Sequence, residues 1–200
     1  MKGKVRTFVA VEVDEGVRNR AAKLIRRLQQ SGADVRWVDT RQMHITLKFL
    51  GEVDLRDVYH ICLAVEKSVA AVEPFSIEVR GVGAFPTPTR PRVLWLGVDD
   101  GAEQMCDLNA RVESALQSLG YPREARRFQA HLTLGRVRRQ DHAVQDLAEM
   151  MREAQDLEFG PSSVDEVVVF SSELQPSGPV YEPMGRAELR GHGRDGPPET

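Results

Sequence analysis

Two short motifs stand out because each places a histidine two residues before a threonine. They are His44-Ile45-Thr46-Leu47 and His131-Leu132-Thr133-Leu134. In a strand, residues i and i+2 point to the same face about 6.6 Å apart, so each motif presents an imidazole and a hydroxyl on one surface. Histidine exchanges protons near neutral pH, and a threonine hydroxyl can donate to a phosphoryl oxygen. Two such strands brought together predict metal-free acid–base chemistry on a phosphodiester.

The two motifs occupy equivalent places in an internal repeat. His131 follows His44 by 87 residues, and the strand end at Val98 follows Val11 by the same 87 residues. A repeat of only two long copies predicts two lobes related by a pseudo-twofold axis. We therefore expect an α+β fold in which each lobe is a mostly antiparallel sheet with helices on its outer face. The two motifs would meet in a groove between the lobes.

Hydrophobic periodicity predicts the elements that position the motifs. Strands are predicted at residues 5–13, 35–38, 44–50, 75–79, 93–98, 128–137, 164–170 and 180–189, helices at 15–31, 55–69, 105–119 and 144–154, and a rigid proline-rich loop at 85–92. Strict alternation in the first motif strand would place His44, Thr46 and Lys48 on one face and Ile45, Leu47 and Phe49 on the other. We predict one bilobal domain at 1–190 and a frayed tail at 191–200, which has no apolar side chain.

Composition narrows the class of protein. The chain of 200 residues is 41% hydrophobic and 28% charged, which predicts an ordinary globular domain rather than a disordered or fibrous chain. A net charge of -3 excludes binding of nucleic acid through the overall charge of the protein, so any contact with a polynucleotide must come from a local group of basic residues. No apolar run is long enough to span a membrane and no signal-like segment opens the chain, so we expect a cytoplasmic protein. Cys62 and Cys106 are expected to be reduced, buried thiols.

Several other residues are weaker candidates for the site. Lys48 could meet a phosphate, although an exposed lysine at a strand end is the favoured interpretation. Phe8, Trp37, Phe85 and Phe128 could stack on a base, with three of the four expected in the core. Arg90 and Arg92 could line the rim of the groove. The remaining histidines, His60, His142 and His192, are expected to be exposed or incidental.

The motifs and their flanking segments resemble a known family. These segments are Arg36-Trp37-Val38, residues 44–51 (HITLKFLG), Gly83-Ala84-Phe85-Pro86, residues 131–137 (HLTLGRV), Ser172-Glu173-Leu174 and residues 178–183 (GPVYEP). Together they are similar to the 2H phosphoesterase superfamily, and within it to the RNA 2',3'-cyclic phosphodiesterases, historically called 2'-5' RNA ligases of the LigT/ThpR type. The resemblance covers residues 4–189. One departure is Ala130, where that branch often has proline.

The resemblance implies hydrolysis of RNA 2',3'-cyclic phosphate ends to 2'-phosphomonoesters, with reversible 2'-5' ligation as an in vitro activity. It implies that His131 is the base that activates water and His44 the acid, although the near-symmetry of the motifs leaves this order open. Thr46, Thr133 and Arg136 would bind the phosphate. Simple alternation turns Arg136 away from His131, so either the strand bulges or the guanidinium reaches round an edge.

The expected partners are RNA ends or small nucleotide cyclic phosphates, with no cofactor, no metal, no membrane and no obligate protein partner, in a monomer. Two alternatives stay open. The chain could be a 2H phosphoesterase for another small cyclic phosphate or a 2'-5' oligonucleotide, because the four central groups contact only the phosphate. It could also be a non-catalytic module that binds RNA ends. A metal-dependent phosphodiesterase is disfavoured, because no clustered Asp and His ligand motif is present.

Overall fold

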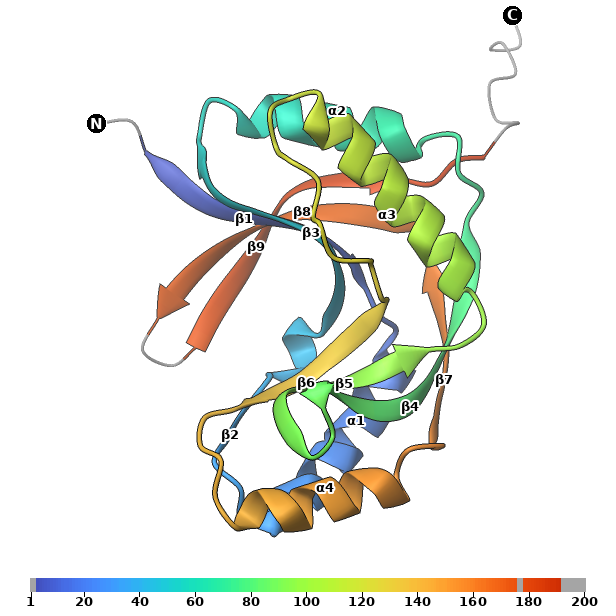
Figure 1. The fold of residues 1–200 in the computed structure, drawn as a ribbon. Helices are drawn as coiled ribbons and strands as arrows, with labels where there is room; N and C mark the ends of the chain where they lie inside the picture. Colours follow the sequence, from blue (N-terminus) through green and yellow to red (C-terminus); the bar gives the residue numbers. More distant parts are fainter. Residues whose placement is uncertain (1–2, 176–177, 192–200) are drawn as a thin grey trace, which may run out of the picture.

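The computed structural model describes residues 3–175 and 178–191. Within them, nine strands form one curved antiparallel sheet in the order β7-β4-β5-β6-β3-β1-β8-β9, with β2 paired to β6 (Figure 1). The strands are β1 (Lys4–Glu12), β2 (Val35–Trp37), β3 (His44–Asp54), β4 (Phe75–Thr87), β5 (Arg90–Val98), β6 (His131–Val137), β7 (Glu158–Val164), β8 (Glu166–Gln175) and β9 (Gly178–Glu188). The α-helices are α1 (Glu15–Leu28), α2 (Val58–Val69), α3 (Ala102–Gln117) and α4 (Ala143–Glu153). Short 3-10 turns lie at Gln29–Ser31 and Thr40–Gln42.

The sheet has two halves that meet at β3 and β6. One half, which we call the β3 lobe, contains β1, β3, β8 and β9, and the other, the β6 lobe, contains β4, β5, β6 and β7. A single residue pair, Ile45 with Leu132, joins the halves. The predicted α+β fold with two pseudo-twofold lobes is confirmed, although the two expected sheets are continuous through this one pair.

The helices cover the outer face of each lobe, as predicted, but two of them are exchanged between the sequence halves. The helix α1 follows β1 yet packs against β7 and α4 of the β6 lobe, and α3 follows β5 yet packs against β3 and α2 of the β3 lobe (Figure 1). The start of α3 lies 87 residues after the start of α1, so the exchange obeys the internal repeat. Each lobe is therefore built from both halves of the sequence.

The most deeply buried side chains form one hydrophobic cluster that spans both lobes. It contains Val9 and Ile45 from the β3 lobe together with Leu94 and Leu132 from the β6 lobe, all at most 1% exposed. The inward stripes of the four helices supply most of the remainder, because their apolar residues recur at helical spacing. Core packing thus continues across the junction at which the two motif strands meet.

Some sequence predictions are wrong. The proline-rich segment at 85–92 is not a loop, because β4 runs to Thr87 and β5 begins at Arg90, so it forms a hairpin. The strand β7 was not expected, because its sequence, with Gly160, Pro161 and two serines, lacks an apolar run; it pairs at the edge of the sheet, where proline is tolerated. Helix α2 begins at Val58, later than predicted. Cys62 is half-buried and Cys106 is exposed, although both were expected in the core.

Two further points concern the ends of the chain and the membrane. The predicted tail at 191–200 lies outside the described residues except for Gly191, whose amide donates to the carbonyl of Val72. None of the helices in the described ranges combines the length and apolar character needed to cross a membrane.

Candidate active site

The two histidines begin the two central strands of the sheet. Ile45 and Leu132 pair between β3 and β6, so the antiparallel register sets His44 across from Thr133 and Thr46 across from His131. Directly opposed residues point to the same face of a sheet, and both paired core residues are fully buried on the other face. All four side chains line one groove. The structure thus brings together the four groups of the two motifs.

Both imidazole rings are held in the same way by the backbone. Nδ1 of His44 lies 2.8 Å from the carbonyl oxygen of Gln42, and Nδ1 of His131 lies 2.7 Å from that of Gln129. A carbonyl oxygen only accepts hydrogen bonds, so each Nδ1 carries a proton. In the neutral ring the second nitrogen, Nε2, is therefore the unprotonated one and is available as an acceptor. Gln129 follows Gln42 by 87 residues, so both copies of the repeat contain this contact.

Burial lowers the pKa of both histidines below the ordinary value. For His44, desolvation is the main cause, and the Gln42 carbonyl and the carboxylate of Glu12 oppose it by favouring the charged ring. For His131, desolvation is again the main cause and Gln129 opposes it, while the positive charges of Arg136 and Arg126 lower the pKa further. Both rings are therefore biased toward the neutral form.

Arg136 reaches the same face as His131 because β6 bulges. In the pairing with β5, Leu94 is opposite Gly135 and Trp95 is opposite Thr133, so Leu134 is an extra residue. This shift reverses the alternation beyond it, and Arg136 lines the groove. Of the two routes considered from the sequence, the structure contains the bulge. The freed carbonyl of Leu134 accepts a hydrogen bond from the amide of Val38 at 2.9 Å.

The equivalent bulge in β3 overturns the prediction for Lys48. Val9 pairs with Lys48 and Ala10 with Thr46, which leaves Leu47 as the extra residue, 87 positions before Leu134. The side chain of Lys48 consequently points away from the groove into the interior and is 2% exposed. Lys48 was expected to share the face of His44 at the surface, and both parts of that prediction are wrong.

Phe49 is displaced by the same shift in the opposite direction. It was expected on the inner face with Ile45, but it lines the groove and is 55% exposed. Phe49 and Arg136 are separated by 87 residues, so the repeat places an aromatic ring on one side of the groove where the other side has a guanidinium.

Each histidine contacts at least one aromatic ring. His44 contacts Phe8 and Tyr181, with ring centroids 4.8 and 5.3 Å apart, and Phe8 stacks on Phe170 at 5.2 Å. On the other side, Phe85 lies 5.2 Å from His131. All four aromatic candidates from the sequence, Phe8, Trp37, Phe85 and Phe128, line the groove. Phe8 is 3% exposed, and Trp37 and Phe128 are partly buried and pack against the core, so three of the four contact the core as expected while also facing the groove.

Sequence reasoning did not single out Tyr181. It lies within the segment at 178–183 that contributed to the family resemblance, and it is held opposite His44 by the pairing of β9 with β8. Burial raises the pKa of the Tyr181 phenol, while the charges of Arg136, Arg36 and Arg6 oppose that shift. The only signal in the sequence was an aromatic residue in a turn-flanked motif, which does not reveal a partner 137 residues away.

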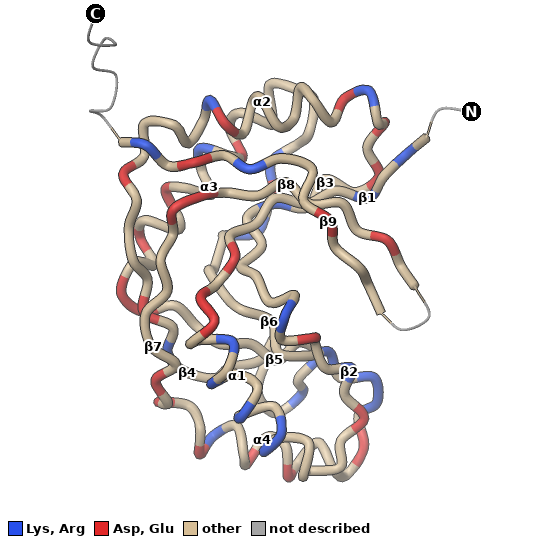
Figure 2. Tube along the Cα trace, turned by 180° about the vertical axis from the view of Figure 1, so that it is seen from behind, with Lys and Arg blue, Asp and Glu red and all other residues tan. Residues whose placement is uncertain are grey.

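The groove is large and lined with arginine. Its volume is about 1530 Å³, and its lining includes Arg6, Arg36, Arg41, Arg123, Arg126, Arg127, Arg136 and Arg138 against Asp39, Glu113 and Glu124. Both signs of charge are dispersed over the outside of the two lobes (Figure 2). A chain of net charge -3 therefore concentrates positive charge locally at this site. Arg90 and Arg92 are not among the lining residues.

Residues outside the groove complete the comparison with the sequence. His60 and His142 are exposed, as expected, and His192 lies outside the described residues. Among the residues that the structure describes, no group of three or more His, Cys, Asp or Glu side chains is placed to hold a metal ion. The arrangement offers two proton-transfer groups, two hydroxyls and a guanidinium around one point of the groove.

The fold and the repeated halves agree with comparisons to known proteins. A family model described as LigT like Phosphoesterase matches residues 11–95 and 96–181. The chain belongs to this family, the 2H phosphoesterases. The two matched copies correspond to the internal repeat, and each contains one His-x-Thr motif.

The similarity to named relatives and to solved structures covers nearly the whole chain. The chain is 38% identical to the RNA 2',3'-cyclic phosphodiesterase of Methanothermobacter thermautotrophicus over 90% of this chain and 97% of that protein. It is 33% identical to the protein of the same name from Thermotoga maritima, over 94% and 97%. The crystal structure of the TT0787 protein of Thermus thermophilus matches with a TM-score of 0.79 and 26% identity, covering 94% of this chain and 100% of that one.

Proposed function

We propose that this protein hydrolyses the 2',3'-cyclic phosphate at an RNA end to a 2'-phosphomonoester. The observation that carries the proposal is the pairing of β3 with β6, which sets two imidazoles and two threonine hydroxyls on one face with both Nδ1 atoms bound to backbone carbonyls. Relatives that bear the name RNA 2',3'-cyclic phosphodiesterase support it, because they cover nine-tenths of the chain.

The proposed step is an in-line displacement by water. His131 accepts a proton through Nε2 from the attacking water, and a bond forms between the water oxygen and phosphorus. The bond from phosphorus to the 3' oxygen breaks, and His44 gives that oxygen a proton, which leaves the phosphate on the 2' oxygen. After the step His131 is protonated and His44 is neutral, so His131 releases one proton to solvent and His44 takes one up before the next turnover.

The remaining groups stabilise the charge that develops on phosphorus. The hydroxyls of Thr46 and Thr133 donate to the non-bridging oxygens, and the guanidinium of Arg136 pairs with them as a fork of donors. The lowered pKa of His131 suits a base, because the ring is neutral at neutral pH. His44 takes the acid role that the family resemblance implies, and the carboxylate of Glu12 supports that role by partly opposing the desolvation that lowers the pKa of this ring.

Several parts of this proposal go with it as predictions. The reaction needs no metal or cofactor, and residues 1–190 act as one bilobal domain, which the helix exchange between lobes favours. The same displacement with the 5' hydroxyl of a second RNA in place of water would form a 2'-5' linkage and release the 3' hydroxyl. A monomeric state and a cytoplasmic location stay predictions from the sequence.

The decisive experiment uses a short RNA with a 2',3'-cyclic phosphate end, incubated with the protein in the presence of EDTA. The product is identified by mass and by the position of its phosphate. His44→Ala and His131→Ala are expected to lower turnover by about 100-fold or more. His60→Ala and His142→Ala are matched controls, since both residues are exposed and lie outside the groove. They are expected to retain wild-type turnover.

Each outcome decides between the candidates. A 2'-phosphate product that requires both motif histidines supports the proposal. Turnover of only mononucleoside cyclic phosphates or 2'-5' oligonucleotides would favour the second enzymatic candidate. Tight RNA binding without turnover, unchanged in His131→Ala, would indicate a binding module. Loss of activity on adding EDTA would contradict the metal-free step.

A further inference from the structure

The two halves of the repeat differ at one place beside the active site. In the β6 lobe, β2 pairs directly with the end of β6, and Trp37 is opposite Gly135. A Cβ on Gly135 would lie 2.8 Å from Val35 Cγ1 and 3.1 Å from the Arg36 carbonyl oxygen, so only glycine admits this close approach. The residue equivalent to Gly135 in the β3 lobe is Lys48, 87 positions earlier. With a lysine at this position, the equivalent segment does not pair with β3.

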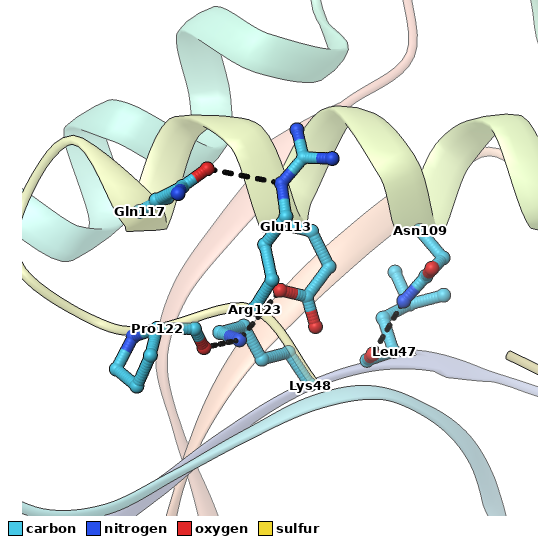
Figure 3. A network of polar contacts seen from close by, with 7 residues as sticks. All are labelled: Leu47, Lys48, Asn109, Glu113, Gln117, Pro122 and Arg123. Carbon is cyan, nitrogen blue, oxygen red and sulfur yellow. Dashed lines mark hydrogen bonds and ion pairs between the residues drawn. The ribbon is translucent and has the colours of Figure 1, made fainter. Parts of the chain in front are cut away.

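That equivalent segment is residues 122–128, which we call the arginine arm. It begins 87 residues after Val35 and does not form a strand. Lys48 reaches it instead. Its Nζ donates to the carbonyl oxygen of Pro122 at 2.8 Å and to Oε2 of Glu113 on α3 at 2.7 Å (Figure 3). A single side chain thus replaces the strand pairing that holds β2 in the other lobe.

The contacts of Lys48 form a buried brace. The side chains of Lys48 and Glu113 are only 2% and 9% exposed, and one turn earlier on α3 the side chain of Asn109 donates to the carbonyl of the bulged residue Leu47 at 2.8 Å (Figure 3). A buried ion pair costs desolvation and persists where its geometry specifies a unique arrangement. Here it joins the strand β3, the helix α3 and the start of the arm.

The arm carries three arginines and one glutamate into the groove. Arg123, Arg126, Arg127 and Glu124 all belong to its lining. The guanidinium carbon of Arg126 lies 5.3 Å from the centroid of Phe85, the ring that contacts His131 in the opposite lobe. In the described part of the chain, none of these three arginines forms an ion pair with a carboxylate; Arg123 donates to the side chain of Gln117. Their charges are available to an anionic ligand.

We propose that the arginine arm binds the internucleotide phosphates of an RNA chain next to its cyclic phosphate end, with Arg126 as the contact nearest His131 and the Lys48–Glu113 pair as the device that positions the arm. This inference rests on the proposed function and adds a basis for choosing an RNA chain over a mononucleotide. Arg126 and Lys48 were not assigned such roles from the sequence.

The position of Arg126 explains why the arm would contact the RNA chain rather than the reacting cyclic phosphate. Arg136 already lies on the face of His131 and Thr133, where the reacting phosphate must sit. Arg126 approaches from the other lobe and lies over Phe85, beside that position. A groove of about 1530 Å³ also exceeds the 300–1,000 Å³ or so of typical small-ligand pockets. The groove therefore has room for the last nucleotides of an RNA chain.

The test compares two substrates on the same variants. One is a short RNA with a 2',3'-cyclic phosphate end, and the other is a mononucleoside 2',3'-cyclic phosphate, which has no internucleotide phosphate. Both rates are measured at a pH above the acid limb of kcat/KM, where His131 is neutral with or without the Arg126 charge that lowers its pKa. Under these conditions Arg126→Ala is expected to lower kcat/KM for the RNA by about tenfold, because a charge-assisted contact is lost, and to leave the mononucleotide within about twofold. Arg111→Ala is the matched control, since Arg111 is an exposed arginine of α3 outside the groove.

Salt dependence gives an independent reading of the same contact. Each phosphate neutralised on a single strand contributes a slope of about -0.7 to the logarithm of affinity against the logarithm of salt concentration. Arg126→Ala should therefore make the slope of log kcat/KM for the RNA shallower by about 0.7, and Arg126→Lys should retain it. A merely structural role for Arg126 would not change this slope.

The brace is tested by removing both charges together. Lys48→Met alone leaves Glu113 buried without a counter-ion and could prevent folding, whereas the double variant Lys48→Met/Glu113→Leu removes both charges and keeps an apolar interior. The double variant also removes the donor to Pro122. It is expected to fold, to lose several-fold in kcat/KM on the RNA and to act normally on the mononucleotide.

The outcomes separate this inference from the proposed function. Equal losses on both substrates in Arg126→Ala, or no loss on either, would overturn the arm as a chain-binding element while the reaction stands. A folded double variant with wild-type activity and salt slope on the RNA would overturn the positioning role of Lys48. A wild-type protein that acts on neither substrate would overturn the proposed function itself.

Discussion

Replacing Arg136 tests the bulge in β6, the assignment of the base and the contact with phosphate in one series. The bulge at Leu134 turns Arg136 into the groove, and its charge is one of the causes that lower the pKa of His131, after desolvation. Arg136→Ala removes both the donor fork and the charge. Arg136→Lys keeps the charge but loses the fork geometry, so the pair of variants separates the two effects.

The expected size of the effect follows from the contacts. A hydrogen-bonded arginine opposite a phosphate contributes about 1.5–3 kcal/mol, which corresponds to a loss of about 10- to 150-fold in kcat/KM for Arg136→Ala. The positive charge disfavours protonation of His131, so its removal raises the pKa of that ring. His131 must be neutral to accept a proton from water, so the acid limb of the kcat/KM profile moves to higher pH. In Arg136→Lys that limb stays near its wild-type position.

The assay is the pH dependence of kcat/KM on an RNA with a cyclic phosphate end, with Arg92→Ala as the control. Arg92 is an exposed arginine of β5 that does not line the groove, so it should behave as wild type. A loss below about twofold in Arg136→Ala would refute the phosphate contact. An acid limb that stays fixed or moves to lower pH in that variant would refute His131 as the base whose pKa Arg136 lowers.

Two further predictions concern stability. Lys48→Met is expected to cost about 3–5 kcal/mol because Glu113 loses its buried partner, lowering the melting temperature by about 6–20 °C, while Lys48→Met/Glu113→Leu stays within about 1 kcal/mol of wild type. Calorimetry checks this, and equal destabilisation of the single and double variants would contradict it. Gly135→Ala places a Cβ 2.8 Å from Val35 Cγ1 and should force β2 away from β6. The free energy of unfolding, measured with denaturant, should fall by about 1–3 kcal/mol. An unchanged unfolding midpoint would show that β2 moves aside without loss of stability.

The asymmetry between the two lobes has a functional meaning within a symmetric fold. The repeat duplicates the histidines, the threonines and the Gln carbonyls that orient the rings. It does not duplicate Arg136, whose counterpart is Phe49, or Gly135, whose counterpart is Lys48. In the proposed reaction the symmetric groups contact the phosphodiester itself, and the asymmetric ones give the groove a direction. A directional site suits a substrate with two different ends.

Local patterns were enough to predict the elements that hold the motifs. The apolar stripes of α1 and α4 recur at helical spacing, and the spacing of 87 residues between His44 and His131 predicted the pseudo-twofold fold. These features are encoded by residues close together in the chain or by direct repetition, so no knowledge of tertiary contacts was needed. His44 and Thr46 were also placed on the correct face, because they precede the bulge and simple alternation still applies to them.

The predictions fail where a distant segment decides the outcome. One extra residue at Leu47 turns Lys48 inward and Phe49 outward, and nothing local marks it, because the bulge depends on the register of β1 and on the Asn109 side chain that bonds the freed carbonyl. The exchange of α1 and α3 between the lobes likewise depends on tertiary contacts, because each helix packs its apolar stripe against elements of the lobe opposite to the strand that precedes it. The sequence by itself determined which groups the candidate active site contains and that they come in two copies. Only the tertiary structure decided which neighbours face the groove, because facing depends on pairing between strands that the chain brings together from far apart.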